Sequence, residues 1–369
     1  MALQRSTQPY DRAFNFSAGP CTLPVEVLEE ARDSLMNYNG SGASVMELSH
    51  RGKDYDALHM QAFADLRELM GIPEDYKIAF LQGGASLQFT MLAMNFLPVG
   101  AAADYIVTGA WGKKAVEAAK IHGGVPQVIY DAKASNYDHA PKLSDIKQSA
   151  NSAFIHMSHN ETIQGVDFME EPSGEGIWIN DMSSNILSRP CNVSRYAMIY
   201  AGAQKNMGPA GLTVAIVRQD MIDKIPDGLP PMLDYRTYFE NDSMYNTPPC
   251  WSIYVAGLVY KWVKKLGGLE AMDKINSEKA KTIYDVIDGS GFYKGHAQLA
   301  NRSKMNITFT LPDEDMTAAF LKEAKENRLL ELKGHRSVGG CRASIYNAFP
   351  LEGCQVLASF MKDFEQRNG

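Results

Sequence analysis

The chain has 369 residues, 45% hydrophobic and 21% charged, which predicts a globular protein with more than one core. Its formal net charge of −7 gives no general attraction to nucleic acid or to an anionic membrane, so we expect neither as a partner. No apolar run is long enough to span a bilayer, and polar residues follow Met1-Ala2-Leu3, where a signal peptide would have its apolar core. We therefore expect a cytoplasmic protein.

The cysteines are odd in number, widely separated and free of any C-x-x-C pair. This pattern predicts reduced packing residues rather than a disulfide framework or a zinc site. The five are Cys21, Cys191, Cys250, Cys341 and Cys354.

The first two-thirds of the chain alternates between helical and strand-like patterns. Amphipathic helices are expected at residues 25–38 and 55–70, packed on a sheet or bridging to a partner. Short apolar runs then alternate with helix-like stretches, which predicts a mostly parallel α/β sheet covered on both faces. Only a short link precedes the last run, so that strand is expected to be antiparallel. The predicted strands are residues 77–81, 105–107, 128–130, 153–155, 177–179, 198–200 and 212–217.

The pattern changes after Pro248 and Pro249, and the remainder predicts a small α+β unit. We expect a large α/β domain at residues 25–260 and a small domain made of residues 1–24 and 261–369. The arm before Phe14 is expected to be mobile. The predicted helices are residues 252–266, 269–287, 316–326 and 353–365, and the predicted strands are residues 305–311 and 342–346.

Ligands of open α/β sheets bind beyond the carboxyl ends of the strands, so the polar residues after each run are candidate site residues. Gln82-Gly83-Gly84-Ala85-Ser86 follows the first strand and opens a helix, a place that suits a phosphate. A plain turn is the alternative, because neither the P-loop pattern nor the dinucleotide fingerprint is present.

Two further candidates follow later strands. Trp111 comes after the second strand, where its indole is suited either to stacking on a flat ligand or to core packing. Asp181 ends the fifth strand, where a buried carboxylate needs a cation or an N–H⁺ partner. Capping of a following helix is the alternative for Asp181.

Lys205 follows the sixth strand within the small, uncharged stretch Ala201 to Gly211. Without an acidic neighbour, burial would lower its pKa and make it an amine nucleophile, whereas a surface lysine is the alternative. The four candidates together make the sharper prediction. Pyridoxal phosphate needs four such features: a helix start for its phosphate, an aromatic ring to stack on, a carboxylate for its ring N–H⁺ and an amine for its aldehyde.

The chain resembles the phosphoserine aminotransferase family, a class V group of pyridoxal-phosphate-dependent enzymes. The matching motifs run in the family's order from near one end of the chain to the other. The resemblance implies a fold-type-I transferase, with a large domain on a mostly parallel mixed sheet and a smaller α+β domain. The motifs are Asn15 to Pro20, Ser44 to Arg51, Asn160 to Ile163, Asp181 to Ser184, Leu187 to Pro190, Ala201 to Gly211, Asn246 to Pro249, Gly334 to Arg336 and Arg342 to Asn347.

Roles of the cofactor-site residues follow from the resemblance. It implies that Lys205 binds the cofactor aldehyde and transfers the substrate proton, and that Asp181 pairs with the pyridinium nitrogen. Trp111 would stack on the ring, and Thr162 would contact its phenolic oxygen side. The cofactor phosphate would bind to Ala85, Ser86 and Gln204, joined by Asn246 and Thr247 from the second subunit of a homodimer.

The substrate residues are likewise implied. Arg342 would bind the α-carboxylate, for which a bidentate guanidinium is suited. The distal anion would bind to His335 and Arg336, together with His50 and Arg51 from the other subunit. The implied reaction transfers the amino group of glutamate to 3-phosphohydroxypyruvate. Whether the longer substrate of vitamin B6 synthesis, 3-hydroxy-2-oxo-4-phosphooxybutanoate, is also accepted stays open.

Some features depart from the family pattern. Ser158-His159 stands where a Cys-Pro pair is expected, which leaves the shape of that loop open. His156 and His159 suggest a metal pair, but no third ligand is nearby, so we expect structural roles and no metal. The rival functions are a serine or alanine–glyoxylate aminotransferase, a cysteine desulfurase, and a non-catalytic protein that binds a phosphorylated metabolite.

Overall fold

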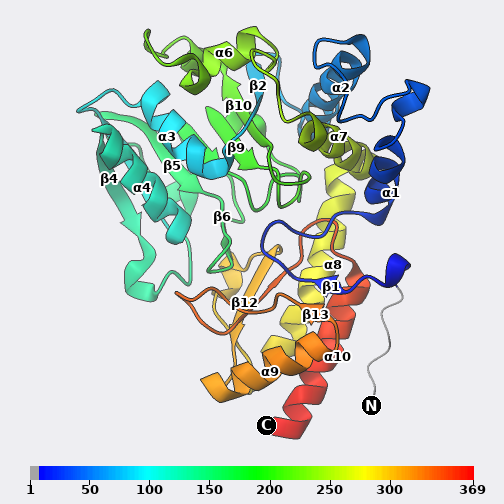
Figure 1. Cartoon of the computed structure of the whole chain (residues 1–369). Helices are drawn as coiled ribbons and strands as arrows, with labels where there is room; N and C mark the ends of the chain where they lie inside the picture. The colour runs from blue at the N-terminus through cyan, green and yellow to red at the C-terminus, as the bar shows by residue number, and fades with distance from the viewer. Residues whose placement is uncertain (1–7) are drawn as a thin grey trace.

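A computed structural model describes residues 8–369, so most of the N-terminal arm lies outside the described residues. Its largest element is a seven-stranded sheet in the order β2-β10-β9-β8-β5-β3-β4 (Figure 1). The strands are β2 (Tyr76–Leu81), β3 (Ala102–Val107), β4 (Val125–Asp131), β5 (Ser152–Ser158), β8 (Trp178–Asp181), β9 (Met198–Gly202) and β10 (Thr213–Arg218). Each contains or overlaps a predicted run, and the predicted α/β class is confirmed.

The sheet is mixed because of β10, which runs antiparallel to both β9 and β2, as predicted from its short link. That link, residues 203–212, is too short for a crossover helix. Gly211 lies in it at φ 111°, and a Cβ there would be 2.8 Å from Ser252 Oγ. The link begins at the carboxyl end of β9 and contains Lys205. Ligands of such sheets bind at this edge, so Lys205 lies at the ligand-binding edge.

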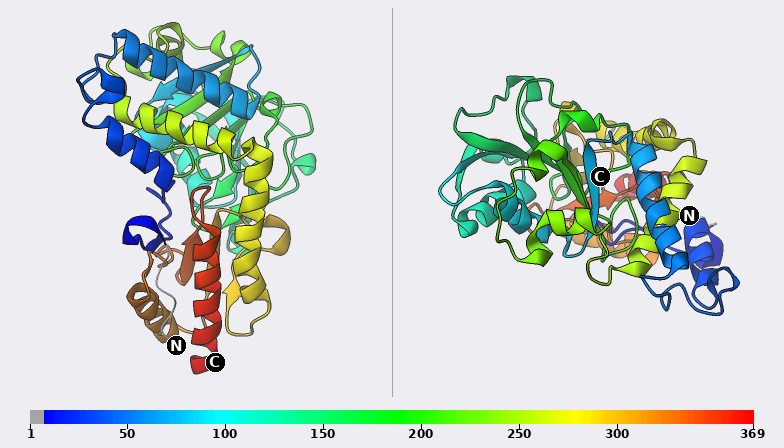
Figure 2. Two further views of the ribbon diagram at one scale, coloured as in Figure 1. Left: turned by 90° about the vertical axis from the view of Figure 1, so that its right-hand side faces the viewer. Right: turned by 90° about the horizontal axis from the view of Figure 1, so that it is seen from above.

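Helices cover both faces of the sheet (Figures 1 and 2). Alternate residues of β10 enter different cores, as the two-residue period of a strand requires: Val214 packs with α2 and α7, whereas Ala215 packs with α3, α4 and α6. The predicted packing of residues 55–70 on the sheet is thus confirmed. The helices are α2 (Lys53–Met70), α3 (Gly84–Phe96), α4 (Ala110–His122), α6 (Tyr235–Glu240) and α7 (Cys250–Lys265), with a short α5 (Gln219–Ile222).

The first helix is shorter than predicted. α1 covers Val25–Ser34 and packs on α7, and a separate 3-10 helix follows at Tyr38–Gly40. Asn37 has a φ of −159° and a ψ of 92°, an extended conformation that an α-helix does not accommodate. The predicted helix to residue 38 was therefore wrong in its last turn.

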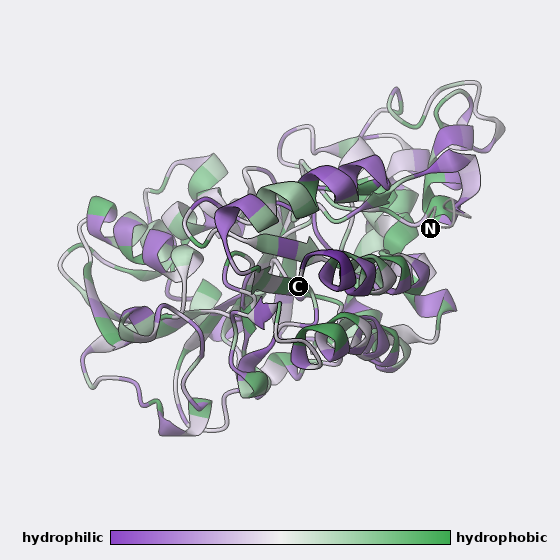
Figure 3. Ribbon diagram, turned by 90° about the horizontal axis from the view of Figure 1, so that it is seen from below, coloured by the Kyte–Doolittle hydropathy of each residue, from purple (hydrophilic) through white to green (hydrophobic). Residues whose placement is uncertain are grey.

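A second, smaller sheet with the order β11-β12-β14 packs against α8, α9 and α10. Figure 2 shows α8 and α10 side by side below the large sheet. Figure 3 shows that these helices carry both hydrophilic and hydrophobic residues along their length. These elements are β11 (Lys294–Gly295), β12 (Asn306–Thr310), β14 (Cys341–Ser344), α8 (Gly268–Asp288), α9 (Glu314–Glu326) and α10 (Leu351–Asn368).

The start of the described chain joins this second unit. β1 (Phe14–Asn15) pairs in parallel with β13 (Leu329–Leu330), and Phe16 packs in the same core as β12 and α10. The boundary expected at residue 260 stays a prediction. Within residues 8–369, no helix combines the length and the apolar character that crossing a bilayer requires.

Candidate active site

A cavity of about 440 Å³ lies at the ligand-binding edge of the large sheet, between that sheet and the second unit. All four chemical features predicted from the sequence line it: the start of α3, the indole of Trp111, the Asp181 carboxylate and the Lys205 amine. Thr162, Gln204, His335 and Arg342 also line it, as do Ala18 and Gly19 of the N-terminal segment.

Lys205 is buried, and its amine points to hydroxyl groups rather than to a carboxylate. Nζ donates to Thr162 Oγ1 at 2.7 Å and to Ser184 Oγ at 2.8 Å. Burial lowers the pKa of Lys205 to about 8, against the opposing attraction of Asp181. The alternative of a surface lysine is excluded, and the amine has the lowered pKa that a nucleophile requires.

Asp181 is the last residue of β8 and is also buried. Its Oδ1 accepts a hydrogen bond from the backbone N–H of Ser183 at 2.9 Å. The alternative role, capping of a following helix, is wrong, because residues 182–190 form turns and bends but no helix. Burial raises the pKa of Asp181, while Ser183 and the charge of Lys205 lower it. Among residues 8–369 this carboxylate has no ion-pair partner within 4.0 Å, which leaves it suited to an N–H⁺ of a ligand.

The start of α3 offers an anion site. Gly83 and Gly84 have φ values of 85° and 63°, so the strand turns directly into the helix. The first intrahelical bond at this end is Leu87 N to Gly83 O, which leaves the N–H groups of Ala85 and Ser86 available to a ligand. No acidic residue occupies the first turn, so the positive helix end is not neutralised.

The position of Trp111 depends on Glu161, a residue that we did not single out from the sequence. β6 (Asn160–Glu161) and β7 (Val166–Asp167) form a two-stranded hairpin. The fully buried Glu161 carboxylate accepts backbone N–H bonds from Trp111 at 3.0 Å and Gly112 at 2.9 Å. A Cβ at Gly109 would lie 2.5 Å from Glu161 Cδ, so only glycine fits there. Glu161 thus fixes the start of α4.

The basic residues expected to bind substrate divide into two groups. His335 and Arg342 line the cavity, and Arg342 Nη1 donates to Thr162 O at 3.4 Å. Arg336 is exposed next to them. The pKa of His335 is lowered by burial and by the positive charges of Arg342, Arg336 and Lys114. Lys114, another residue not singled out from the sequence, completes the basic wall.

The residues that the resemblance assigns to a neighbouring subunit, both the basic pair and the cofactor-phosphate pair, lie outside this cavity. Asn246, Thr247 and Arg51 are exposed, and His50 is half-buried. Thr247 Oγ1 is 3.5 Å from His50 Nδ1, so the two motifs meet on the surface of the chain. They are the residues that the resemblance assigns to the neighbouring subunit, and none of them lines the cavity that contains Lys205.

Comparisons with known proteins agree with this geometry. The model of the family described as Aminotransferase class-V matches residues 13–357. The chain belongs to this family. It is 53% identical over 358 residues to the phosphoserine aminotransferase of Geobacillus kaustophilus, covering 96% of this chain and 99% of the relative.

Solved structures give the same result. The chain superposes on a phosphoserine aminotransferase from Bacillus circulans subsp. alkalophilus with a TM-score of 0.95 and 49% identity, covering 97% of this chain and 100% of the other. A PLP-bound phosphoserine aminotransferase from Trichomonas vaginalis gives a TM-score of 0.90 and 41% identity, covering 95% of this chain and 100% of the other. This member of the class V family is therefore a pyridoxal-phosphate-dependent transaminase.

The cavity residues of this class V enzyme fit pyridoxal phosphate. The buried carboxylate of Asp181 has no cationic partner within 4.0 Å in the described chain, and a pyridinium N–H⁺ would supply one. The free N–H groups at the start of α3 suit a phosphate, and the buried Lys205 amine suits an aldehyde.

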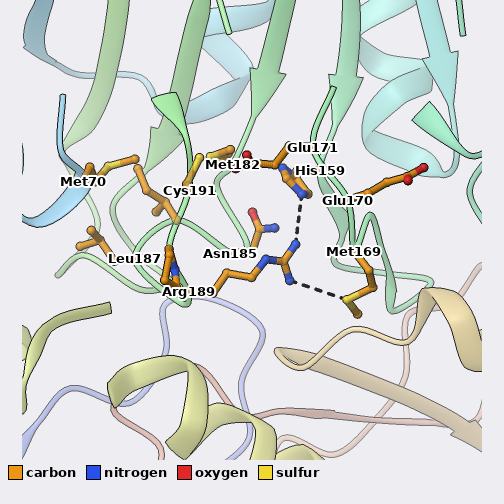
Figure 4. Close-up of a pocket in the computed structure, with 12 residues that line it drawn as sticks. Met70, His159, Met169, Glu170, Glu171, Met182, Asn185, Leu187, Arg189 and Cys191 are labelled. Carbon is orange, nitrogen blue, oxygen red and sulfur yellow. Dashed lines mark hydrogen bonds between the residues drawn. The ribbon is translucent and has the colours of Figure 1, made fainter. Parts of the chain in front are cut away.

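A second cavity, of about 220 Å³, lies apart from this site and contains none of the predicted site residues (Figure 4). Arg189 extends across it towards His159 and Met169. The Arg189 guanidinium forms a bidentate pair with the buried Asp167, at 2.8 and 2.9 Å. This pair anchors the segment that follows Asp181 to the β6–β7 hairpin, so we assign it a structural role.

The histidines considered as a metal pair have separate partners. His156 Nε2 is 2.8 Å from the Tyr200 hydroxyl. His159 Nδ1 is 2.8 Å from Asn180 Nδ2, and its Nε2 is 3.0 Å from Phe168 O. Burial lowers the pKa of His156 to about 3 and that of His159 to about 4, so both imidazoles are neutral. Ser158 is the last residue of β5 and His159 follows it; both are buried, and these hydrogen bonds hold the His159 ring.

Proposed function

We propose that this enzyme transfers the amino group of L-glutamate to 3-phosphohydroxypyruvate, giving O-phospho-L-serine and 2-oxoglutarate. The observation that carries the proposal is one cavity in which the buried Lys205 amine and the buried Asp181 carboxylate face a basic wall that includes Arg342. An amine and a carboxylate serve amino-group chemistry, and the cations serve substrates that carry an anion at each end.

The cofactor would be held by residues of the cavity. The backbone N–H groups of Ala85 and Ser86 and the side chain of Gln204, which line the cavity, would bind its phosphate. Asp181 would pair with the ring N–H⁺, Trp111 would stack on the ring, and Thr162 would contact the phenolic oxygen. When bound, pyridoxal phosphate supplies the electron sink that makes the α-hydrogen of an amino acid acidic.

Lys205 would move the proton. Its Nζ has a pKa of about 8, so a neutral amine is accessible near physiological pH, as a general base requires. Nζ donates hydrogen bonds to the hydroxyl oxygens of Thr162 and Ser184, which orient it. Unlike a carboxylate, these hydroxyls carry no charge that would neutralise the ammonium. We assign to Nζ the removal of the substrate α-proton and the holding of that proton for its return to the reacting molecule.

The substrate would be bound at both ends. Arg342, half-buried beside Thr162, is suited to the α-carboxylate through a bidentate guanidinium. We define the distal clamp as His335 and Arg336 with His50 and Arg51 of a neighbouring subunit. This distal clamp would bind the γ-carboxylate of glutamate in one half-reaction and the phosphate of the oxo acid in the other half-reaction.

We further propose a homodimer with shared sites. His50 and Thr247 contact each other on the surface, outside the cavity of their own chain, which suits residues that reach the cavity of a second copy. Arg51 would then extend the distal clamp, and Asn246 and Thr247 would reach the cofactor phosphate. A two-fold dimer would complete both sites with the same contacts.

Three measurements test the proposed function. Borohydride reduction of the purified holoenzyme, followed by peptide mapping, should label Lys205 and no other lysine. A colourless preparation with no labelled lysine would support the non-catalytic rival instead. Turnover of 3-phosphohydroxypyruvate should greatly exceed that of unphosphorylated hydroxypyruvate. The reverse preference would favour the rival hypothesis of a class V aminotransferase that acts on another substrate.

A further inference from the structure

Lys114 is a cation of the cavity wall to which the preceding assignments give no role. It lies on α4 three residues after Trp111, and residues with this spacing share one helix face. Its Nζ lies 4.3 Å from the centroid of the Trp111 ring, and the residue lines the cavity with His335 and Arg342. The same helix face thus presents an indole and an ammonium to the ligand.

This ammonium has no acidic partner in the described chain. No carboxylate of residues 8–369 lies within 4.0 Å of Lys114 Nζ. The acidic groups of the site, Asp181 and Glu161, are buried deeper, and Glu161 is engaged by the start of α4. The surrounding side chains His335, Arg336 and Arg342 are basic, and the charge of Lys114 already acts on His335. Clustered like charges repel, and a bound anion relieves the repulsion.

The neighbouring lysine shows a different arrangement. Lys113 Nζ lies 4.4 Å from the centroid of the Tyr137 ring, and Lys113 does not line the cavity. Both lysines are exposed, and both contact an aromatic ring. Exposure and ring contact therefore do not explain why Lys114 alone joins the basic wall, and Lys113 offers a matched control.

We propose that Lys114 contacts the distal anion of the substrate from the subunit that supplies Lys205, and that it favours a phosphate over a carboxylate. The inference rests on the proposed function and adds a specificity-determining residue to the distal clamp. A phosphate monoester carries a charge of about −1.5 to −2 near neutral pH, so an added cation stabilises it more than a single carboxylate. A lysine is suited to this role, because its flexible point charge needs no fixed geometry.

The test compares Lys114→Met with Lys113→Met in the holoenzyme. We expect Lys114→Met to lower kcat/KM for 3-phosphohydroxypyruvate by about tenfold, mainly through KM, because a ground-state contact is lost. The loss with glutamate should be about threefold, and unphosphorylated hydroxypyruvate should be affected by less than about twofold. Lys114→Arg should restore most of the phosphate preference, and Lys113→Met should match the wild type.

Two results would overturn the inference. Equal losses for phosphorylated and unphosphorylated substrates would mean that Lys114 acts only by holding the Trp111 ring. A Lys114→Met enzyme identical to Lys113→Met would mean that it makes no contact. A wild-type enzyme with no preference for the phosphorylated oxo acid would instead refute the proposed function, so the two failures are distinguishable.

Discussion

The Lys205 amine lies 2.7 Å from the hydroxyl oxygen of Thr162, and that hydroxyl oxygen lies 2.5 Å from the hydroxyl oxygen of Ser184. The buried cation is therefore solvated by neutral oxygens. Hydroxyls stabilise an ammonium less than a carboxylate does, so burial is the largest influence on the Lys205 pKa.

The first prediction concerns Thr162→Val, which removes one of these acceptors and keeps the shape of the side chain. The loss destabilises the ammonium, so the Lys205 pKa should fall by about 0.5–1 unit from its value in the wild type. The pH dependence of Lys205 acetylation in the cofactor-free protein measures this shift. Thr317→Val, on the distant α9, should leave the midpoint unchanged. An upward shift would contradict the hydrogen-bond assignment.

The second prediction concerns Asp181→Asn, which keeps the shape of the side chain and removes its charge. Because we propose that this carboxylate pairs with the cofactor ring nitrogen, its loss should lower kcat by about a thousandfold. Burial raises the pKa of Asp181, which means that the charged form is destabilised by folding. The cofactor-free variant should therefore melt at the same temperature as the wild type or higher. Full turnover by this variant would remove Asp181 from the catalytic set.

The third prediction concerns the pH dependence of stability through Glu161. Burial raises the pKa of this carboxyl from its ordinary value of 4.5 to about 7. The folded protein then binds the proton more tightly than the unfolded chain, so this group lowers stability as pH rises between these values. Glu161→Gln stays neutral, and it should lose that part of the pH dependence, on the order of 3 kcal/mol at most.

Urea unfolding of the cofactor-free protein at about pH 5 and about pH 7.5 measures this difference. Glu117→Gln is the matched control, because Glu117 is an exposed carboxylate on α4, the helix whose start Glu161 holds. That variant should show the wild-type pH dependence. A Glu161→Gln variant that also keeps the wild-type pH dependence would show that the carboxyl titrates normally in the fold.

The fourth prediction concerns shared sites. Lys205→Ala and Arg51→Ala should each inactivate the proposed homodimer. A hybrid of the two subunits should regain about half of the wild-type activity, because one of its sites carries both changes and the other carries neither. A hybrid of Lys205→Ala with Arg342→Ala should stay inactive, since both residues line one cavity of one chain. Equal activity of the two hybrids would contradict the proposed dimer.

Much of the large sheet could be predicted from the sequence, because buried parallel strands are continuous apolar runs and their carboxyl ends share one edge. The same rule brought Lys205, Asp181 and Trp111 to one cavity. Two-residue strands such as β1 and β13 could not be predicted. Their pairing depends on a partner far away in the chain, and two residues are too few to show a hydrophobic periodicity.

Glu161 and Lys114 were missed for different reasons. The role of Glu161 depends on the close approach of the β6–β7 hairpin to the start of α4. This is a tertiary contact, and the only local sign of it in the sequence is the glycine at position 109. Lys114 stands next to Lys113, and the two differ only in the direction they face on α4. The spacing from Trp111 to Lys114 was the available signal, because it places both on one helix face.

The parallel pairing of β1 with β13 imposes an order on biosynthesis. Ala18 and Gly19 line the cavity that contains Lys205, and Ala18 O accepts a hydrogen bond from the Tyr346 hydroxyl at 2.9 Å. These residues leave the ribosome first, but their partners at Leu329 and Tyr346 are among the last to be translated. The wall of the cavity that the N-terminal segment supplies can therefore be fixed in place only after nearly the whole polypeptide has been made.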